Sequence, residues 1–508
     1  MIMIDNNYSL LFSILILTSL FWRYVQTKRS TAQQLAMPYP NQTSWIWGHE
    51  LEIFQHEASE MYIKWAASIG LVYRIKAALF QPDIIIVGDN SAAQHILQNS
   101  NRYVKAPAFL RLITRHIGKG LVCVEGEDHK YQRRLLAPAF TSSAVEAMAD
   151  DIFSCVDKMT QNLRSTLIAT GETNDDIVDV VPIMSACTLD IIGRVGFGHD
   201  FEGGKSTEGR AISSAWRHDM VMTRTFTGFV APIVINVFPW IIKFPIAAFR
   251  DGVVRRIIHK LAGKLISDNS KNMNVLHVHD KRDKSEARLT TVELLDNTTA
   301  VTVDFILLQL ARNPSIQRKL QQEIRSVASL DYSTIVGLEY LNAVAKEGLR
   351  LHPVGAPTER IALRDDVIPL NQAIRTGSGE MVSSFTIKAG QVFRIPWTVL
   401  NTNQQVWGNN ADEFIPERWI EPGGILPPNK LPHGPWAGVS SFSDGPRSCI
   451  GFRLAVLELK IIIAALVRSF EFEPTEAKII QQLSLSLQPF ADGKVSSMPL
   501  KVTLAPEL

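Results

Sequence analysis

A cysteine at the start of a long apolar segment is the residue best placed to do chemistry in this sequence. Residues 442–451 read Phe-Ser-Asp-Gly-Pro-Arg-Ser-Cys-Ile-Gly, and the apolar helical pattern of residues 452–470 follows directly. The N-terminus of a helix offers free N–H groups and partial positive charge, which favour the thiolate form of Cys449. Gly445 and Gly451 allow the backbone to approach a flat cofactor, and Arg447 can reach a carboxylate. The loop therefore predicts a metal-ligating cysteine, whereas an isolated cysteine before a helix is more often structural.

This loop resembles the haem-binding signature Phe-x-x-Gly-x-Arg-x-Cys-x-Gly of the cytochrome P450 family, and every fixed position is matched. The resemblance implies that Cys449 is the axial ligand of haem iron. It also implies that Phe442 shields the sulfur and that Arg447 pairs with a haem propionate. A thiolate ligand donates electron density to the iron and favours cleavage of the O–O bond.

Three more residues are expected at the cofactor by the same resemblance. His129 and Arg133 lie four residues apart, and hence on one face of a predicted helix. The family usually has Trp-x-x-x-Arg at this place, where both side chains bind a propionate; His replaces Trp here and keeps an N–H donor. Arg360 lies where the family places another propionate partner. Without the cysteine loop, the His129–Arg133 pair would be interpreted as a solvated helix face.

A second group of charged residues is expected to be structural. Glu347 and Arg350 are three residues apart in a helical pattern, which alone indicates a surface ion pair of small energetic value. Together with the Pro-Glu-Arg-Trp sequence of residues 416–419, they resemble the family's Glu-x-x-Arg and Pro-Glu-Arg-Phe/Trp combination. The resemblance implies that Glu347, Arg350 and Arg418 interlock behind the haem and hold the cysteine loop in place.

The central helix departs from the family pattern. Residues 289–297 resemble its opening and residues 298–314 its second half, but the Ala/Gly-Gly-x-Asp/Glu-Thr-Thr motif retains only its threonines. Either the motif has diverged in place, or roughly a dozen residues, about 18 Å of helix, are absent at the Asn297–Thr298 junction. The family relays protons to iron-bound oxygen through an acid and an alcohol. Thr298 can supply the alcohol, while Asp296 and Asn297 are imperfect substitutes for the acid.

Length and composition restrict the organisation of the chain. The 508 residues contain no internal Pro-, Gly- and Ser-rich linker, which predicts one catalytic domain over residues 51–508. Because 52 basic residues balance 50 acidic ones, a nucleic-acid partner is not expected. Four cysteines without a Cys-x-x-Cys pair suit a reducing compartment. The predicted fold class is mainly α with small β-sheets, a cytochrome P450 fold behind a single N-terminal transmembrane helix.

The N-terminal segment predicts that anchor. Residues 10–22 are almost wholly apolar and are followed by Lys28 and Arg29, so residues 1–28 are interpreted as a membrane anchor and its flank. Residues 29–50 form a proline-containing hinge. A cleaved signal peptide is the competing interpretation, but Asp5 precedes the apolar core and no small-x-small cleavage site follows it. The basic flank predicts a single-pass protein, in the endoplasmic reticulum by the resemblance, with a cytosolic catalytic domain.

Several elements follow from local patterns. Strands are predicted at residues 72–75, 83–87, 384–387 and 392–396, and helices from Ser91 and over residues 341–351. The last two strands should border the substrate pocket, with Val354 and Thr358 as further lining candidates. Residues 271–288 are charged and predict an exposed loop. The apolar residues 238–245 fit either a membrane-dipping loop or ordinary core.

The resemblance as a whole implies a membrane-bound fungal haem-thiolate monooxygenase of secondary metabolism. It would insert one atom of O₂ into an apolar small molecule, such as a terpenoid. Electrons would come from NADPH through a separate cytochrome P450 reductase, because the chain has no dinucleotide-binding fingerprint. Two alternatives remain open: a haem-binding chain impaired at the central helix, and a peroxide-using or isomerising haem-thiolate enzyme.

Overall fold

The structure is a computed structural model that describes most of the chain from Met37 onward. The described residues are 37–41, 43–118, 120–170, 177–243, 284–355, 357–377, 379–421, 431–484 and 486–506, with Thr18, Val253 and residues 255–257. Between residues 284 and 297 the backbone alone is described. Apart from Thr18, the predicted anchor of residues 1–28 lies outside the described residues, as does the hinge before Met37.

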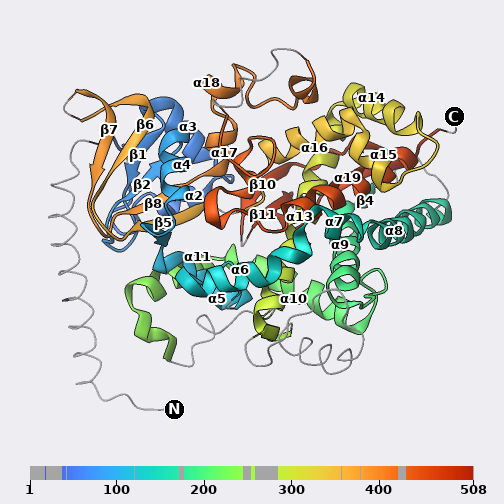
Figure 1. Ribbon diagram of the computed structural model, residues 1–508, viewed down its shortest axis with the longest axis horizontal. Coiled ribbons are helices and arrows are strands. Elements are labelled where there is room, and N and C mark those ends of the chain that lie inside the picture. Colours follow the sequence, from blue (N-terminus) through green and yellow to red (C-terminus); the bar gives the residue numbers. More distant parts are fainter. Residues whose placement is uncertain are drawn as a thin grey trace.

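A five-stranded sheet forms one end of the molecule (Figure 1). Its strand order is β1-β2-β8-β5-β3, with β2 and β8 parallel and all other neighbours antiparallel. Its strands are β1 (Val72–Ile75), β2 (Ile84–Val87), β3 (Tyr103–Lys105), β5 (Thr358–Ala362) and β8 (Val392–Ile395). Every residue of β1 and β2 is buried, as the apolar β-branched sequence of β2 favours. The hairpin of β6 (Asp366–Arg375) and β7 (Met381–Ile387) packs beside it against α4 (Asn90–Gln98).

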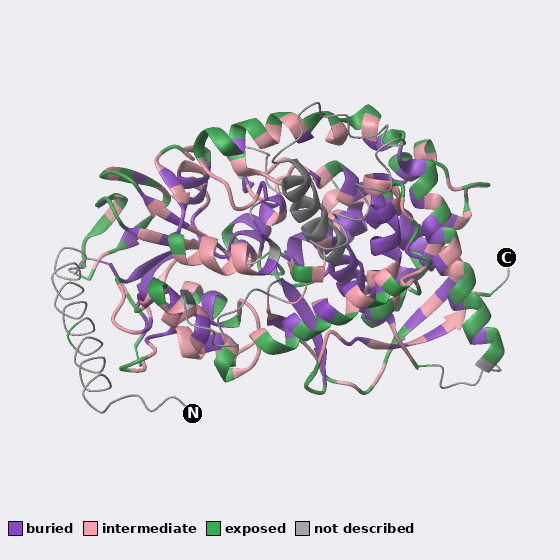
Figure 2. Cartoon of the chain, turned by 90° about the horizontal axis from the view of Figure 1, so that it is seen from below, coloured by how far each residue is buried: buried purple, intermediate pink, exposed green. Residues whose placement is uncertain are grey.

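The helical part of the molecule is built around α13 (Lys284–Arg312). This helix contacts α9 (Val180–Phe197), α16 (Glu339–Leu351) and α19 (Phe452–Ser469). From Ala300 to Ala311 nearly every residue of α13 is buried, because neighbouring helices cover it on several sides. Figure 2 shows the buried residues gathered in the interior of the molecule and the exposed ones on its outward faces.

The remaining described elements complete the helical shell and form two small sheets, built mainly from C-terminal strands. The other α-helices are α2 (Glu50–Gln55), α3 (Glu60–Ile69), α5 (Pro107–Ile117), α6 (Gly126–Leu136), α7 (Ser142–Glu146), α8 (Ala149–Thr170), α10 (Thr207–Thr223), α11 (Phe226–Val237), α14 (Pro314–Arg325), α15 (Tyr332–Gly337), α17 (Trp397–Asn401) and α18 (Gln404–Trp407). The short 3₁₀ helices are η1 (Ala137–Phe140), η2 (Pro239–Lys243), η4 (Pro416–Trp419), η6 (Ser440–Phe442) and η7 (Gly445–Arg447). The two three-stranded sheets have the orders β10-β11-β12 and β4-β13-β9, from β4 (Ile177–Asp179), β9 (Phe470–Pro474), β10 (Ile479–Leu483), β11 (Leu487–Ala491), β12 (Lys494–Val495) and β13 (Pro499–Leu504).

Most of the locally predicted elements are confirmed. The predicted strands coincide with β1, β2, the end of β7 and β8, and the predicted helices with α4, α16 and α19. The side chain of Asp89 caps α4 by accepting a hydrogen bond from the Ala92 N–H at 3.0 Å.

One loop prediction is partly wrong. Residues 271–283 lie outside the described residues, but residues 284–288 belong to the first turns of α13 and are not a loop. Lys, Glu, Ala and Arg are good helix formers, so a charged sequence does not distinguish a loop from a helix start. The backbone of α13 is helical without interruption through the Asn297–Thr298 junction.

Within the described part of the chain, α9 is the one helix long and apolar enough to cross a membrane. Sixty-one per cent of it is buried inside the protein, as in the core helix of a globular domain. Helices α10 and α11 meet the same criterion only as a pair, bent by 79° at their junction.

Candidate functional site

The residues predicted at the cofactor line one cavity. This cavity has a volume of about 290 Å³ and lies between α13, the cysteine loop of residues 442–451, the start of β5 and the α5–α6 region. Its lining includes every predicted catalytic or cofactor-binding residue: His129, Arg133, Thr298, Arg360, Phe442, Arg447 and Cys449. The sequence separated these residues by as many as 320 positions, and the fold brings them together.

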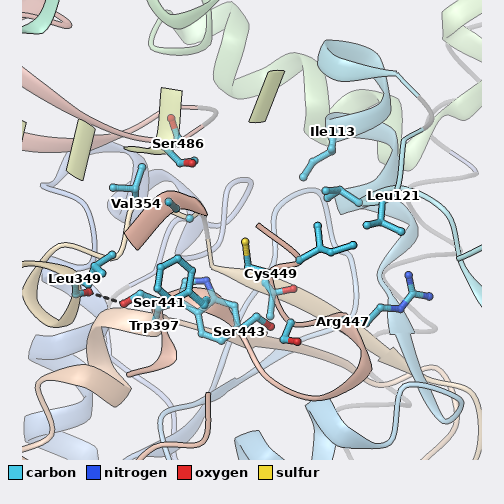
Figure 3. Close-up of a pocket in the computed structure, with 18 of the residues that line it drawn as sticks. Ile113, Leu121, Leu349, Val354, Trp397, Ser441, Ser443, Arg447, Cys449 and Ser486 are labelled. Carbon is cyan, nitrogen blue, oxygen red and sulfur yellow. Dashed lines mark hydrogen bonds between the residues drawn. The ribbon is translucent and has the colours of Figure 1, made fainter. Parts of the chain in front are cut away.

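The cysteine loop delivers the sulfur of Cys449 to this cavity. Figure 3 shows the sulfur pointing into the space bordered by Val354 and Ser486 on one side and by Ile113 and Leu121 on the other. The Cys449 N–H donates to the Phe442 carbonyl at 2.8 Å, which closes the loop.

Close packing of the loop against α4 requires glycine at position 445. Gly445 has φ +66°, and a Cβ there would lie 2.6 Å from the Leu97 carbonyl oxygen. The cysteine loop therefore packs against α4 independently of any cofactor.

Burial raises the pKa of the Cys449 thiol, although a backbone hydrogen bond from Gly451 and the charge of Arg133 act in the opposite direction. Desolvation of the sulfur is the largest influence on this pKa, and a bound metal cation stabilises a buried thiolate.

Four cationic side chains converge on the same cavity: Lys105, Arg133, Arg360 and Arg447. Arg133 donates to the Ser448 carbonyl at 2.7 Å, and Arg360 to the Thr358 hydroxyl at 2.7 Å. Arg447 donates to the Val124 carbonyl at 2.6 Å and pairs with the carboxylate of Glu125. Burial lowers the pKa of Arg360 to about 10, with the neighbouring Arg447 acting in the same direction.

His129 is a neutral member of this group. Burial, together with the charges of Arg447, Lys105 and Arg133, lowers its pKa to about 3. The imidazole therefore carries one N–H and no charge near pH 7. In this state His129 is a neutral hydrogen-bond donor, like the Trp that it replaces.

The charges of this cavity fit a haem with its two propionates. Four cationic side chains line the cavity, those of Lys105 and Arg360 buried, and the carboxylate near them, Glu125, pairs with Arg447. An uncompensated buried charge is costly. Two further carboxylates would offset the excess. The remaining lining, which includes Ile113, Leu121, Val354 and Trp397, is apolar and suits a flat, largely apolar macrocycle.

Glu347, Arg350 and Arg418 meet behind the cysteine loop. Arg350 donates to the Glu347 carboxylate at 2.8 and 2.9 Å, and Arg418 donates to it at 3.0 Å. Trp419 and the backbone of Ile415 each donate to the same carboxylate at 2.9 Å. Arg350 also donates to the carbonyls of α17 and the segment before η4. Ser440 and Ser441 of η6, directly before the cysteine loop, bind the Asn401 side chain. The network therefore joins α16, η4 and, through Asn401, the cysteine loop.

Thr298 lines the cavity beside Thr299 and Thr302, one turn of α13 farther on. The Thr302 hydroxyl donates to the Thr298 carbonyl at 2.8 Å. Among the described residues no carboxylate lines the cavity. The side chains of Asp296 and Asn297 lie outside the described part, so neither is placed as an acid.

The substrate-lining predictions are correct in part. Val354 and Thr358 line the cavity as expected, but the described residues of β7 and of the 392–396 segment do not. β8 is an inner strand of the five-stranded sheet, where Phe393 and Ile395 are buried in its core, and β7 pairs only with β6. Trp397, which follows this segment, is the residue that reaches the cavity.

Sequence reasoning missed two charged residues of the site, Lys105 and Glu125. Lys105, the last residue of β3, is only 8% exposed, and Glu125 directly precedes α6. A lysine at an inward-facing position of a short strand could have indicated this site. That position can be assigned only after the strand itself has been predicted.

Comparison with known proteins agrees with this geometry. A family profile described as Cytochrome P450 matches residues 37–491. Cytochrome P450 monooxygenase claP of Ampulloclitocybe clavipes is 31% identical over 477 residues, covering 87% of this chain and 88% of the relative. Cytochrome P450 monooxygenase 205 of Postia placenta is 32% identical over 485 residues, covering 86% of each. Ganoderic acid synthetase CYP5150L8 of Ganoderma lucidum is 28% identical over 476 residues, covering 83% of this chain and 85% of the relative.

The P450 family is a haem-thiolate family in which a cysteine is the axial ligand of the haem iron. The match spans the cavity, the cysteine loop and the Glu347 network alike. The chain therefore belongs to the cytochrome P450 family, as a fungal monooxygenase of the oxidoreductase class.

Proposed function

We propose that Cys449 is the axial ligand of the haem iron and that the cavity of about 290 Å³ is the haem and substrate site. The observation that carries this assignment is the convergence of the Cys449 sulfur, three arginines and His129 on one cavity. When bound, the haem supplies the chemistry of oxygen activation. Arg133, Arg360, Arg447 and His129 would orient it through its propionates, and Phe442 would shield the sulfur.

The substrate we propose is an apolar small molecule, such as a terpenoid of fungal secondary metabolism. Phe109, Ile113 and Leu121 line one part of the cavity, and Val354 and Trp397 another. Such walls bind a substrate mainly through buried apolar area and exclude water from the reacting centre. Electrons would come from NADPH through a separate cytochrome P450 reductase.

We also propose that the protein is a single-pass protein of the endoplasmic reticulum with a cytosolic catalytic domain. Exposed aromatic side chains before α2, at the start of α11 and in η2 support this proposal. Trp45 is 77% exposed and Phe226 is 60% exposed; Trp45 contacts Phe80 and Trp47 contacts Phe226, with ring centroids 5.2 and 5.9 Å apart. Trp240, 40% exposed, lies in η2, which contacts α11. Aromatic side chains favour the membrane–water interface.

The direct test of the haem assignment is the absorption spectrum of the reduced protein with carbon monoxide. The wild type should show the red-shifted Soret band of thiolate ligation, and Cys449→Ser should lose it. Cys155→Ser is the control, because Cys155 is buried in the helical core away from the cavity. A thiolate band that survives Cys449→Ser would refute the assignment.

A second candidate function is supported by the lack of a cavity carboxylate among the described residues. A peroxide-using or isomerising haem-thiolate enzyme needs no protons delivered to O₂. Turnover with NADPH, reductase and O₂ supports the monooxygenase; turnover with peroxide alone supports the second candidate. Thiolate ligation without O₂-dependent, peroxide-dependent or isomerising turnover indicates an impaired chain. Sequencing the native transcript across the codons of Asn297 and Thr298 then decides whether helix residues are missing.

A further inference from the structure

A second, smaller cavity adjoins the one described above. It has a volume of about 30 Å³ and lies between the α2–α3 segment, the C-terminal end of α10 and strands β10 and β11. Both cavities are lined by Gly355 and Trp397. Gly355 places no side chain at this junction, and among the described residues a Cβ added there would come within 4 Å of the Trp397 Nε1 alone, at 3.7 Å. We call the smaller space, whose wall also includes Arg224 and Gln482, the annex of the larger cavity.

Gln482 of β10 brings an unsatisfied polar atom to the wall of the annex. The residue is 7% exposed, and among the described residues its Oε1 has no hydrogen-bond partner. Its cross-strand neighbour Gln488 is satisfied at both ends: it donates to the Ser486 hydroxyl at 3.0 Å and accepts from the Ser496 hydroxyl at 2.8 Å. A buried amide oxygen without a donor costs free energy. The wall of the annex therefore offers a hydrogen-bond acceptor that the described protein leaves unused.

Arg224, at the C-terminal end of α10, is a cation of the same wall. Its guanidinium lies over the Phe54 ring, with Cζ 4.3 Å from the ring centroid, and donates to the carbonyl oxygens of Phe54 and Leu483 at 2.9 and 3.3 Å. Burial lowers the pKa of Arg224, and no carboxylate among the described residues acts against this effect. A guanidinium carries five N–H groups, so two hydrogen bonds to carbonyls leave donors for a further acceptor.

A single hydroxyl group suits both residues. It can donate its proton to the Gln482 Oε1 and accept a hydrogen bond from Arg224 through its oxygen. A carboxylate, which can only accept, would suit Arg224 but would bring no proton to the Gln482 oxygen. The volume of about 30 Å³ also admits one small polar group and not a ring or a branched apolar group.

We propose that the annex binds a hydroxyl group of the substrate, which is therefore an alcohol whose apolar body occupies the larger cavity. The inference rests on the proposed function, because it takes the larger cavity as the substrate site. Gln482 and Arg224 are then positioning residues. By holding one end of the substrate in the annex, they restrict which part of its apolar body reaches the reacting centre.

The experiment compares two sesquiterpene probes that differ chiefly in one hydroxyl group, farnesol and farnesene. Equilibrium dialysis against the haem-loaded full-length protein near pH 7 gives both dissociation constants without turnover. The informative quantity is the ratio of the farnesol affinity to the farnesene affinity, because its change between wild type and variant cancels the hydration of the probes. In Gln482→Leu this ratio should fall roughly tenfold, since the hydroxyl proton loses its buried acceptor. The farnesene affinity itself should stay the same or rise, because leucine makes the annex more apolar.

Further variants separate this role from a structural one. Arg224→Met should also lower the ratio, by roughly tenfold or more, since the hydrogen bond that it removes is charge-assisted. Arg453→Met is the matched control: Arg453 also lies over a ring, that of Phe452 at 4.5 Å, but it is exposed and lines neither cavity. It should leave the ratio unchanged. Gln482→Leu should unfold at the same or a higher denaturant concentration, because its Oε1 has no partner to lose among the described residues.

An unchanged ratio in Gln482→Leu would overturn the inference. So would an equal loss of affinity for both probes, which would assign Gln482 to maintaining the fold. Farnesoic acid tests the other oxygen-bearing group. If Arg224→Met weakens its binding relative to farnesene more than it weakens that of farnesol, and Gln482→Leu weakens neither, the annex is a carboxylate site and the hydroxyl assignment is wrong. Dialysis does not use the haem spectrum, so a missing thiolate band, which would refute the proposed function, is a separate result.

Discussion

The carboxylate of Glu347 and the guanidinium of Arg350 form a two-point ion pair, with hydrogen bonds of 2.8 and 2.9 Å, and both side chains are fully buried. The same carboxylate binds Arg418, Trp419 and the Ile415 N–H. Such a pair is costly to bury. Once it is buried, removal of either partner destabilises the protein, because the other charge is left uncompensated. It holds the segments on which the cysteine loop rests.

Glu347→Gln should therefore destabilise the protein by about 3–5 kcal/mol, because two arginines would remain buried with one charge fewer to balance them. Denaturant unfolding of the purified protein measures this. Lys388→Gln is the matched control: its pair with Asp365 is as short, 2.7 Å, but both side chains are more than half exposed. The control should change stability by less than about 1 kcal/mol. Similar effects of the two substitutions would contradict the account of the network.

Thr298→Ala should reduce O₂-dependent turnover while leaving peroxide-driven turnover largely intact. The Thr298 residue lines the cavity, and a hydroxyl there can pass protons that the peroxide reaction does not need. We expect a loss on the order of 10²-fold in the NADPH- and reductase-dependent rate.

Thr302→Ala is the control for this prediction, since it also lines the cavity but its hydroxyl is bonded to the Thr298 carbonyl. If the two variants lose the same activity, Thr298 has no special role. If Thr298→Ala loses nothing, proton delivery uses another group.

His352→Phe should make the free energy of unfolding less dependent on pH at acidic pH. His352 stacks on Phe305, with ring centroids 4.9 Å apart, and burial lowers its pKa to about 4 from 6.5. The unfolded chain therefore binds a proton between pH 6.5 and 4 that the folded protein does not. Stability at this residue is complete above pH 6.5 and is lost as pH falls, by up to about 1.4 kcal/mol per pH unit.

The measurement is the free energy of unfolding of both proteins between pH 4 and 7. Phenylalanine keeps the stack on Phe305 but loses the contact of His352 with Gln309 at 3.0 Å, a cost that is the same at every pH. The slope is therefore the informative quantity. Parallel profiles for the two proteins would show that His352 does not titrate in this way.

Asp304→Leu should stabilise the protein at neutral pH. Asp304 of α13 is fully buried, and among the described residues neither carboxylate oxygen has a hydrogen-bond partner. Burial raises the pKa of this carboxyl well above its usual value, with the charge of Asp179 acting in the same direction. The folded protein thus holds a proton that the unfolded chain releases above pH 3.8, so stability falls as pH rises through that region.

Removing the carboxyl should add on the order of 1–3 kcal/mol near pH 7, the usual cost of an unsatisfied buried polar group. The variant should also lose the decline of stability with rising pH. Thermal unfolding at several pH values tests both points. Because Asp304 does not line the cavity, the spectrum of bound haem should be unchanged. A destabilised Asp304→Leu protein would show that the carboxyl has a partner.

The sequence by itself determined the local elements and the chemical identity of the site. Residues 442–451 identified Cys449 as the candidate ligand, and the spacing of Glu347 and Arg350 and the Pro-Glu-Arg-Trp sequence identified the partners of the network. Strands β1 and β2 followed from β-branched runs, which act over a few residues.

Only the tertiary structure decided what depends on residues distant in sequence. Burial raises the pKa of the Cys449 thiol, and this burial depends on segments far from the cysteine loop in sequence. The like charges of Lys105 and Arg360 became neighbours through the pairing of β3 and β5, which neither strand indicates alone. The cavity wall excludes β8 because that strand lies inside a sheet, a position set by its partners β2 and β5. Desolvation, the distance between charges and the order of strands in a sheet all depend on segments that are distant in sequence. A local sequence pattern therefore cannot predict them.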